Sequence, residues 1–351
     1  MLEEFTYFPA LRTRNAELKA LFHLPPASKN MILPLLEIQP IPNANRLERT
    51  LFRIDEAFND RNFVCDLNHY ALQRPSPKTA FSEFQSLFNP QGGFASYYEF
   101  LSETPFALPV VRSRSDEHDL AAEAARIESL GRRPFVHLRA DSSTDLNFVR
   151  RGYHEFFPEA IYWLDAGWGM SLDDEAMRIS NTLRALTEFD VNAEIVVTSS
   201  TFPDSFTNIG ARGECPIVEQ TIFRNVRAST NAERVYYGDW ASTRPPSSEE
   251  RSGPTPPRID LPISDRWVMF RAIDTEGYQE VAARAVSDGA WPDDLSIWGT
   301  HAIEATAIEA PGGISGQLAA AAARINIHMH VQANRGDLAF SDDEDEPFDD
   351  E

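Results

Sequence analysis

Eight short apolar runs occur in the first 240 residues of this 351-residue chain, and they limit its fold more than any other feature. Most of them are continuous rather than alternating, which is typical of strands whose two faces are both buried. The runs are TYFPALR (6–12), MILPLLEI (31–38), NFVCDLN (62–68), FALPVVR (106–112), PFVHLRA (134–140), AIYWLDA (160–166), AEIVVTS (193–199) and RVYYGDW (234–240). We therefore predict eight strands that are covered on both sides or closed into a barrel.

Segments with helical periodicity separate these strands. NRLERTLFRIDEAF follows the second run and DDEAMRISNTLRALTEF follows the sixth. Alternation of strands and helices indicates parallel βα units joined by right-handed crossovers. An open doubly wound sheet would be expected to carry a GxGxxG turn after an early strand, and no such motif follows one. The sequence therefore predicts an α/β fold of the (β/α)₈ TIM-like barrel type.

We expect one barrel domain over residues 1–335 with additions to it. Residues 70–104 are too long for a simple crossover and predict a helical insertion after the third strand. Residues 243–258 (TRPPSSEERSGPTPPR) read as a Pro/Ser-rich loop, followed by a hairpin or extra strand in RIDLPIS and RWVMFRAID. Residues 336–351 form an acidic tail that is expected to be disordered.

Charge limits the class of partner. The net charge is −22, and residues 341–351 hold eight acids and no base. This balance argues against a broad nucleic-acid surface, although the tail could dock a basic protein partner. The chain has no run long enough to span a membrane and no signal peptide at its start, so the expected compartment is the cytoplasm. The two cysteines, Cys65 and Cys215, read as free thiols.

Charged side chains close most of the predicted strands, where a carboxylate beside a core must be solvated or paired. In a parallel barrel the C-terminal ends of all strands meet at one face, so these side chains are expected to share one polar mouth. The predicted catalytic residues are Glu37, Asp66, Asp165 and Asp239, and the predicted ligand-binding residues are Arg12, Arg14, Arg112, Arg139, Ser199 and Ser200. The alternative is that these charges only satisfy one another.

The residue types narrow the chemistry of the mouth. The only lysines are Lys19, Lys29 and Lys78, and none ends a strand, which argues against Schiff-base chemistry. Ser199 and Ser200 precede Pro203, which is placed to begin a helix whose free N–H groups would suit a phosphate; an ordinary helix start is the alternative. We assign no metal ligands, but a Mg²⁺ cofactor held by carboxylates stays open. His137 is interpreted as a core residue.

The order of several motifs resembles the Beta protein family of bacteriophages and bacteria. They are YFPALRTRNAELKALFHL, ILPLLEIQP, FVCDL, LPVVR, VHLRA, VVTSSTFP, YYGDW, IWGT and INIHMH, which span Tyr7 to His330. The resemblance implies a barrel from phages, prophages or defence-associated gene neighbourhoods. It also implies a shared residue set of Glu37, Asp66, Arg139, Asp165, Asp239 and Arg271, and so adds Arg271 to the ligand-binding residues.

Two main hypotheses follow for function. The first is a protein of phage or antiviral-defence setting that binds or hydrolyses a phosphorylated small molecule or nucleotide at the barrel mouth, as a phosphodiesterase-like hydrolase would. Arginines would clamp the anionic oxygens and a carboxylate would act as general base or metal ligand. The second is a non-catalytic adaptor whose acidic tail or 70–104 insertion engages a protein partner. A nuclease ranks below both because of the acidic balance.

Overall fold

A computed structural model describes residues 2–113, 117–140, 154–169, 172–190, 192–230, 233–247 and 255–335. Its main sheet has eight parallel strands in the order β4-β3-β2-β1-β9-β7-β6-β5. They are β1 (Phe8–Arg12), β2 (Leu35–Ile38), β3 (Phe63–Leu67), β4 (Ala107–Pro109), β5 (Phe135–Arg139), β6 (Ile161–Trp168), β7 (Ile195–Ser200) and β9 (Val235–Asp239). Each strand coincides with one of the eight predicted apolar runs, so that prediction is confirmed.

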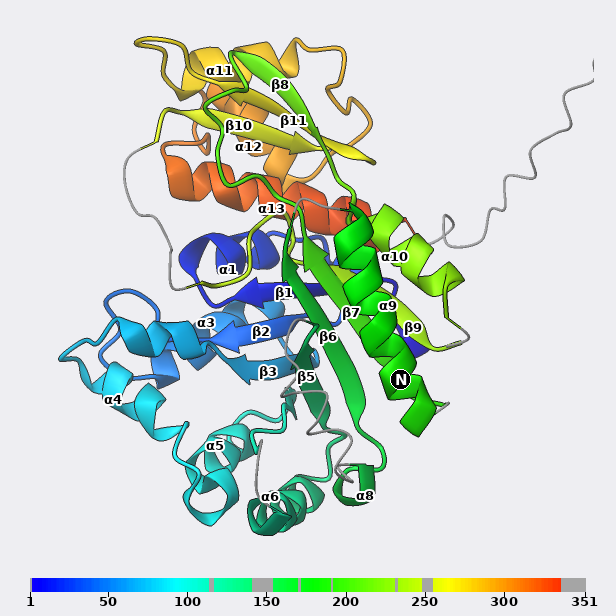
Figure 1. The fold of residues 1–351 in the computed structure, drawn as a ribbon. Coiled ribbons are helices and arrows are strands. Elements are labelled where there is room, and N and C mark those ends of the chain that lie inside the picture. Colours follow the sequence, from blue (N-terminus) through cyan, green and yellow to red (C-terminus); the bar gives the residue numbers. More distant parts are fainter. Residues whose placement is uncertain are drawn as a thin grey trace, which may run out of the picture.

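The two edge strands of this sheet lie next to each other. A parallel bridge joins Val110, just after β4, to Phe135 on β5, and the Val111 N–H donates to the Phe135 carbonyl at 2.9 Å. The sheet is therefore a nearly closed barrel, and the predicted α/β barrel class is confirmed (Figure 1).

Helices surround the barrel (Figure 1). They are α1 (Asn15–Phe22), α2 (Pro26–Asn30), α3 (Glu48–Phe58), α4 (Thr79–Ser86), α5 (Gln91–Ser102), α6 (Glu117–Leu130), α8 (His154–Phe156), α9 (Leu172–Phe189), α10 (Glu219–Ala228) and α13 (Gln317–Ala333), with 3-10 turns η1 (Leu2–Glu4) and η2 (His69–Gln73). Helices α4 and α5 are the predicted helical insertion after the third strand. Among the described residues, no helix combines the length and apolar character needed to cross a bilayer.

A small antiparallel sheet stands beside the barrel. It has the order β10 (Arg258–Pro262), β11 (Arg266–Arg271), β8 (Arg212–Pro216), so the predicted late hairpin is present and β8 joins it from the β7–α10 connection. Helix α11 (Tyr278–Val286) packs on β10 and β11, and α12 (Trp298–Ala307) packs against α11 and α13. Helix α13 packs against both β10 and α1. Figure 1 shows this layer stacked on α13. Helix α13 therefore links the small sheet to the barrel.

Side chains alternate between the barrel lumen and the surrounding helices, as the period of a β-strand requires. Leu36, Cys65 and Leu164 belong to the large core between strands and helices. Their neighbours in sequence, including Leu35, Val64 and Trp163, fill the lumen. On each strand, the residue two positions after such a lumen residue also points inward. It lies nearer the C-terminal end of the strand, at the mouth of the barrel.

Candidate active site at the barrel mouth

Three adjacent strands bring a cation and two carboxylates to one level of the lumen. Arg12 on β1 is paired in register with Glu37 on β2, and Glu37 is paired with Asp66 on β3. Glu37 and Asp66 each lie two residues beyond a lumen residue, so strand periodicity turns both carboxylates inward. All three are nearly buried, with exposures of 5–6%.

Asp66 is the most heavily bonded of these groups. It accepts a hydrogen bond from Arg112 Nη1 and one from the Leu67 N–H at 2.7 Å, while His137 Nδ1 lies 2.6 Å from its Oδ2. Burial by itself would raise the pKa of Asp66, but the Arg112 charge and the His137 hydrogen bond outweigh burial and hold that pKa well below its ordinary value. Asp66 is therefore ionised at neutral pH.

His137, on β5, is the partner of Asp66 across the lumen. Burial lowers the pKa of an imidazole, but the hydrogen bond and the charge of Asp66 more than offset burial and raise the pKa of His137. The pair therefore favours an imidazolium beside a carboxylate. The interpretation of His137 as a core residue missed this role. The signal was present in FVHLR, because His137 has the same strand parity as Phe135, which faces the lumen.

Glu37 has a different environment from Asp66. Its side chain is 6% exposed, and its Oε2 is buried without a hydrogen-bond partner among the described residues. Burial, and next the charge of Asp66, raises the pKa of Glu37 to about 8. Glu37 is therefore protonated at pH 7, while its neighbour Asp66 is ionised. Two carboxyl groups whose pKa values are pushed apart are typical of acid–base sites.

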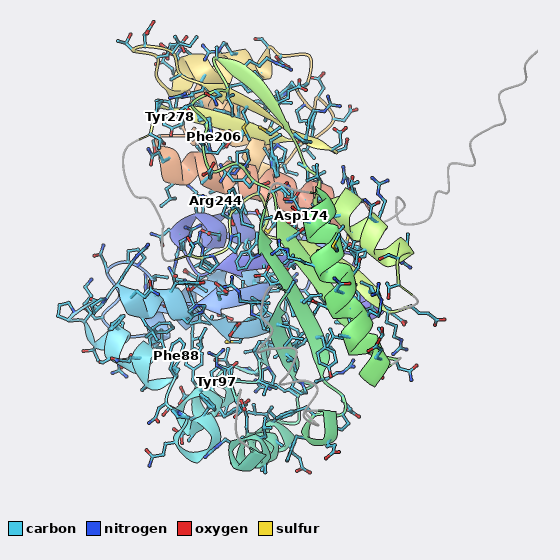
Figure 2. The ribbon with its side chains drawn as sticks, in the orientation of Figure 1. Phe88, Tyr97, Asp174, Phe206, Arg244 and Tyr278 are labelled. Atoms are coloured by element: carbon cyan, nitrogen blue, oxygen red, sulfur yellow. The ribbon has the colours of Figure 1, made fainter. Side chains whose placement is uncertain are left out.

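Arginines border this pair of acids. Arg12 Nε lies 3.9 Å from Glu17 Oε1, and Arg14 Nε donates to the same oxygen at 2.7 Å. The Arg112 guanidinium carbon lies 5.5 Å from the Phe88 ring centre and 5.7 Å from the Tyr97 ring centre. Figure 2 labels both rings, on the side of the barrel covered by α4 and α5. Glu17 thus contacts both Arg12 and Arg14, and aromatic rings flank Arg112.

Arg139 and Asp165 continue the mouth on β5 and β6, where they are paired in register. Arg139 Nη1 donates to the Tyr70 hydroxyl at 3.0 Å. Asp165 Oδ1 accepts from Trp240 Nε1 at 2.9 Å and from the Gly167 N–H at 3.0 Å. Predicted site residues from β1 to β6 therefore meet in one basin.

The same cluster contains a set of potential metal ligands. Glu37, Asp66 and His137 each offer one ligand atom within 4.8 Å of the other two. Two carboxylates and an imidazole suit Mn²⁺ or Zn²⁺ better than Mg²⁺, which prefers oxygen ligands. A metal would have to displace the proton shared by His137 and Asp66 and would stand beside the Arg112 charge. The bonding of Asp66 therefore fits acid–base chemistry more closely than metal binding.

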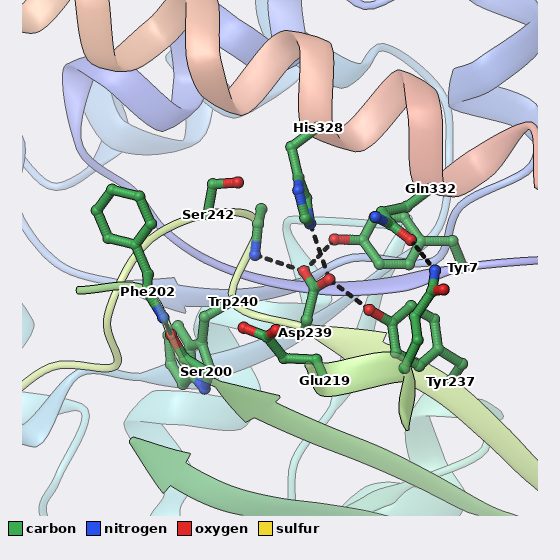
Figure 3. Close-up of polar contacts among 12 residues, drawn as sticks. Tyr7, Ser200, Phe202, Glu219, Tyr237, Asp239, Trp240, Ser242, His328 and Gln332 are labelled. Atoms are coloured by element: carbon green, nitrogen blue, oxygen red, sulfur yellow. Dashed lines mark hydrogen bonds and ion pairs between the residues drawn. The ribbon is translucent and has the colours of Figure 1, made fainter. Parts of the chain in front are cut away.

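Asp239 lies on the other face of its strand, in a separate cluster (Figure 3). It accepts from Tyr7, from Tyr237 at 2.7 Å and from the Ala241 N–H at 2.7 Å, and His328 Nε2 on α13 lies 2.8 Å from it. Tyr236 and Gly238 are the inward residues of β9, so Asp239 faces the helices. The structure thus separates Asp239 from Glu37, Asp66 and Asp165.

The other three predicted residues are Ser199 and Ser200, at the end of β7, and Arg271, at the end of β11. Ser199 is buried, and Ser200 Oγ donates to the Thr243 carbonyl at 2.6 Å. Arg271 is on the small sheet, where Nη1 donates to the Phe206 carbonyl at 3.0 Å. The prediction of a helix that begins at Pro203 is wrong. The segment after β7 leads instead to β8, and the next helix, α10, begins only at Glu219.

The Thr201 N–H, which the phosphate hypothesis would leave open, donates to Glu219 Oε1 at 2.7 Å. Glu219 therefore takes the place that a phosphate oxygen would need. Burial, and next the charge of Asp239, raises the pKa of Glu219 to about 7, which connects it electrostatically to the Asp239 cluster rather than to the mouth.

Comparison with known proteins agrees with this arrangement of the chain. The model of the Beta protein family matches residues 7–334. The protein named "Protein beta" of Enterobacteria phage P4 is 28% identical over 357 residues, which cover 98% of each chain. The resemblance seen in the ordered motifs is therefore confirmed over nearly the whole length. The chain belongs to the Beta protein family.

Proposed function

We propose that the barrel mouth binds a phosphorylated small molecule or nucleotide and hydrolyses it by general acid–base catalysis. One observation carries the proposal: Glu37 is buried and protonated, and it stands beside an ionised Asp66 that is paired with His137. Arg12 is paired in register with Glu37 and is close enough to lower its pKa, so its guanidinium could receive an anionic oxygen beside this acid. The similarity to a phage protein supports the expectation of a phage–host setting.

The proposed step uses Glu37 as a proton donor. Water adds to phosphorus while the bond from phosphorus to the leaving oxygen breaks. Glu37 gives its proton to that oxygen, and the proton released by the water returns to the Glu37 carboxylate. Asp66 acts as a positioning residue, because its charge raises the pKa of Glu37 and holds the His137 imidazolium in place. Arg12 and His137 offset the negative charge that develops on the phosphoryl oxygens.

The test begins with a panel of nucleotides and sugar phosphates, measured by calorimetry and by ³¹P NMR of the products. Glu37→Gln keeps the size of the side chain and removes its proton donor, so turnover should fall by about 10²–10⁴-fold with affinity retained. The matched control is Glu219→Gln, the same change at a buried glutamate of the other cluster. It should leave turnover within about twofold.

The pH dependence gives a second readout. Because the acid must be protonated, turnover should decline as pH rises through about 8. The proposal fails if no compound in the panel binds more tightly than millimolar, or if Glu37→Gln turns over at the wild-type rate.

A further inference from the structure

A cavity lies among the segments that follow the strands carrying Arg12, Glu37 and Asp66. Its volume is about 270 Å³, and Arg14, Gln39 and Asn68 are among the residues that line it. Each of these lies two residues beyond Arg12, Glu37 and Asp66, respectively, on the same three chain segments. The cavity is therefore the next layer outward from the proposed site, on the side where β1, β2 and β3 end.

Local hydrogen bonds continue the barrel into this layer. The Gln39 N–H donates to Thr13 Oγ1 at 2.9 Å, and the Asn68 N–H donates to the Ile38 carbonyl at 3.0 Å. Asn68 Nδ2 donates to Gln39 Oε1 at 2.6 Å, and Asn68 Oδ1 accepts from the Tyr70 N–H at 3.1 Å. These hydrogen bonds hold Gln39 and Asn68 in place at the wall of the cavity.

The chemistry of the cavity is unlike that of the chain as a whole. Arg14, Arg74 and Lys78 line it, and none of its described lining residues is acidic, although the net charge of the chain is −22. Burial, and next the charge of Arg14, lowers the pKa of Arg12 to about 10, and Arg74 also contributes. Arg14 and Arg74 are therefore both close enough to Arg12 to repel its charge, and the charge of Glu17 acts in the opposite direction. Ile41 and Phe81 supply apolar surface beside these cations.

We propose that this cavity, here called the cationic antechamber, binds a second anionic group of the same ligand, so that the preferred ligand carries a diphosphate or longer phosphate chain. The inference rests on the proposed function, which concerns the reacting phosphate, and it adds a binding site for the second phosphate of the same ligand. Phosphate oxygens in the antechamber would offset the repulsion of Arg12 by Arg14 and Arg74. Binding energy gained there would hold the reacting phosphate against Glu37.

The experiment compares ligands that differ by one phosphate. Affinities of phosphate and pyrophosphate, and of a nucleoside monophosphate and its diphosphate, are measured for the wild type and for Arg74→Gln and Lys78→Gln. The wild type should bind the member with two phosphates at least about tenfold more tightly, since one charge-assisted hydrogen bond changes affinity by about this factor. Each variant should reduce that ratio and leave monophosphate affinity unchanged.

The matched control is Arg49→Gln, which removes a cation outside the antechamber that lies over the Phe52 ring. It should keep the wild-type ratio. Arg74 is an exposed residue, so its substitution should not impair folding, and thermal melting of each variant checks this. No preference for the second phosphate in the wild type, or an unchanged ratio in both variants, overturns the proposal.

Failure of the proposed function would look different. A diphosphate preference that depends on Arg74, together with wild-type turnover in Glu37→Gln, would keep the antechamber and reject the catalytic role. Loss of turnover in Glu37→Gln without any diphosphate preference would keep the catalytic role of Glu37 and reject the antechamber as a phosphate site.

Discussion

The same chemical change should have opposite effects at two neighbouring residues of the mouth. Asp66→Asn removes a charge that Arg112 and His137 need, and breaking a buried ion pair costs about 3–5 kcal/mol. Glu37→Gln replaces a side chain that is already neutral at pH 7. Urea unfolding at pH 7 should therefore show Asp66→Asn to be less stable than wild type by about 3 kcal/mol or more, and Glu37→Gln to be at least as stable as wild type.

The pH dependence makes the comparison sharper. The folded-state pKa of Glu37 is raised from an ordinary value of 4.5 to about 8, so the stability that Glu37 contributes is complete below pH 4.5 and is lost as pH rises toward 8. Glu37→Gln lacks this titration. Its free energy of unfolding relative to the wild type should therefore rise by about 1 kcal/mol per pH unit within that window. Above pH 8 this difference should stay constant.

The contribution of Asp66 to stability depends on pH in the opposite direction. Its pKa is lowered on folding, so its contribution is present at neutral pH and is lost only as pH falls below the ordinary range of an aspartate. The deficit of Asp66→Asn should therefore shrink in strong acid. If Glu37→Gln is as destabilising as Asp66→Asn at pH 7, Glu37 is ionised in the folded protein and the reasoning about the site is refuted.

Three further predictions concern the surroundings of the mouth. Gly238→Ala would place a Cβ 2.1 Å from the Phe8 carbonyl oxygen, so unfolding should become easier by about 3 kcal/mol, whereas Gly289→Ala, with open space around it, should stay within about 0.5 kcal/mol. Asp239→Asn should lower the urea midpoint through the loss of its charge, yet leave nucleotide affinity measured by calorimetry within about twofold; a tenfold loss in folded protein would return Asp239 to the ligand site. Deleting residues 336–351 should leave mouth binding unchanged, and loss of biological activity on that deletion with intact binding would favour the adaptor hypothesis.

The strands were predictable because each is a continuous apolar run, and a strand buried on both faces requires one. Their charged ends were also predictable, because Glu37, Asp66 and Asp165 interrupt such runs. The face of the sheet on which each charge lies depends on strand parity, and the predicted set of site residues includes charges from both faces. Parity separates Asp239 from Asp66, since Asp239 follows the outward residue Tyr237 by two, whereas Asp66 follows the inward residue Val64 by two.

Other features depend on contacts between distant segments. Strand β8 forms only because β11 offers an edge to residues 212–216, and its sequence RGECP has little apolar character of its own. The pKa of Glu37 arises from burial in the lumen and from Asp66 on the next strand, so no local pattern around Glu37 could reveal it. His137 likewise becomes part of the site only through Asp66, which is 71 residues away in the chain.

The most direct test of the account is a crystal structure of the protein soaked with a nucleoside diphosphate and a sugar phosphate at concentrations well above their measured dissociation constants. We expect density for a phosphoryl group at the barrel mouth, in contact with Arg12 and within hydrogen-bond reach of Glu37. Density only at Ser199 and Ser200 or on the small sheet, or a mouth that holds no ligand under these conditions, would contradict it.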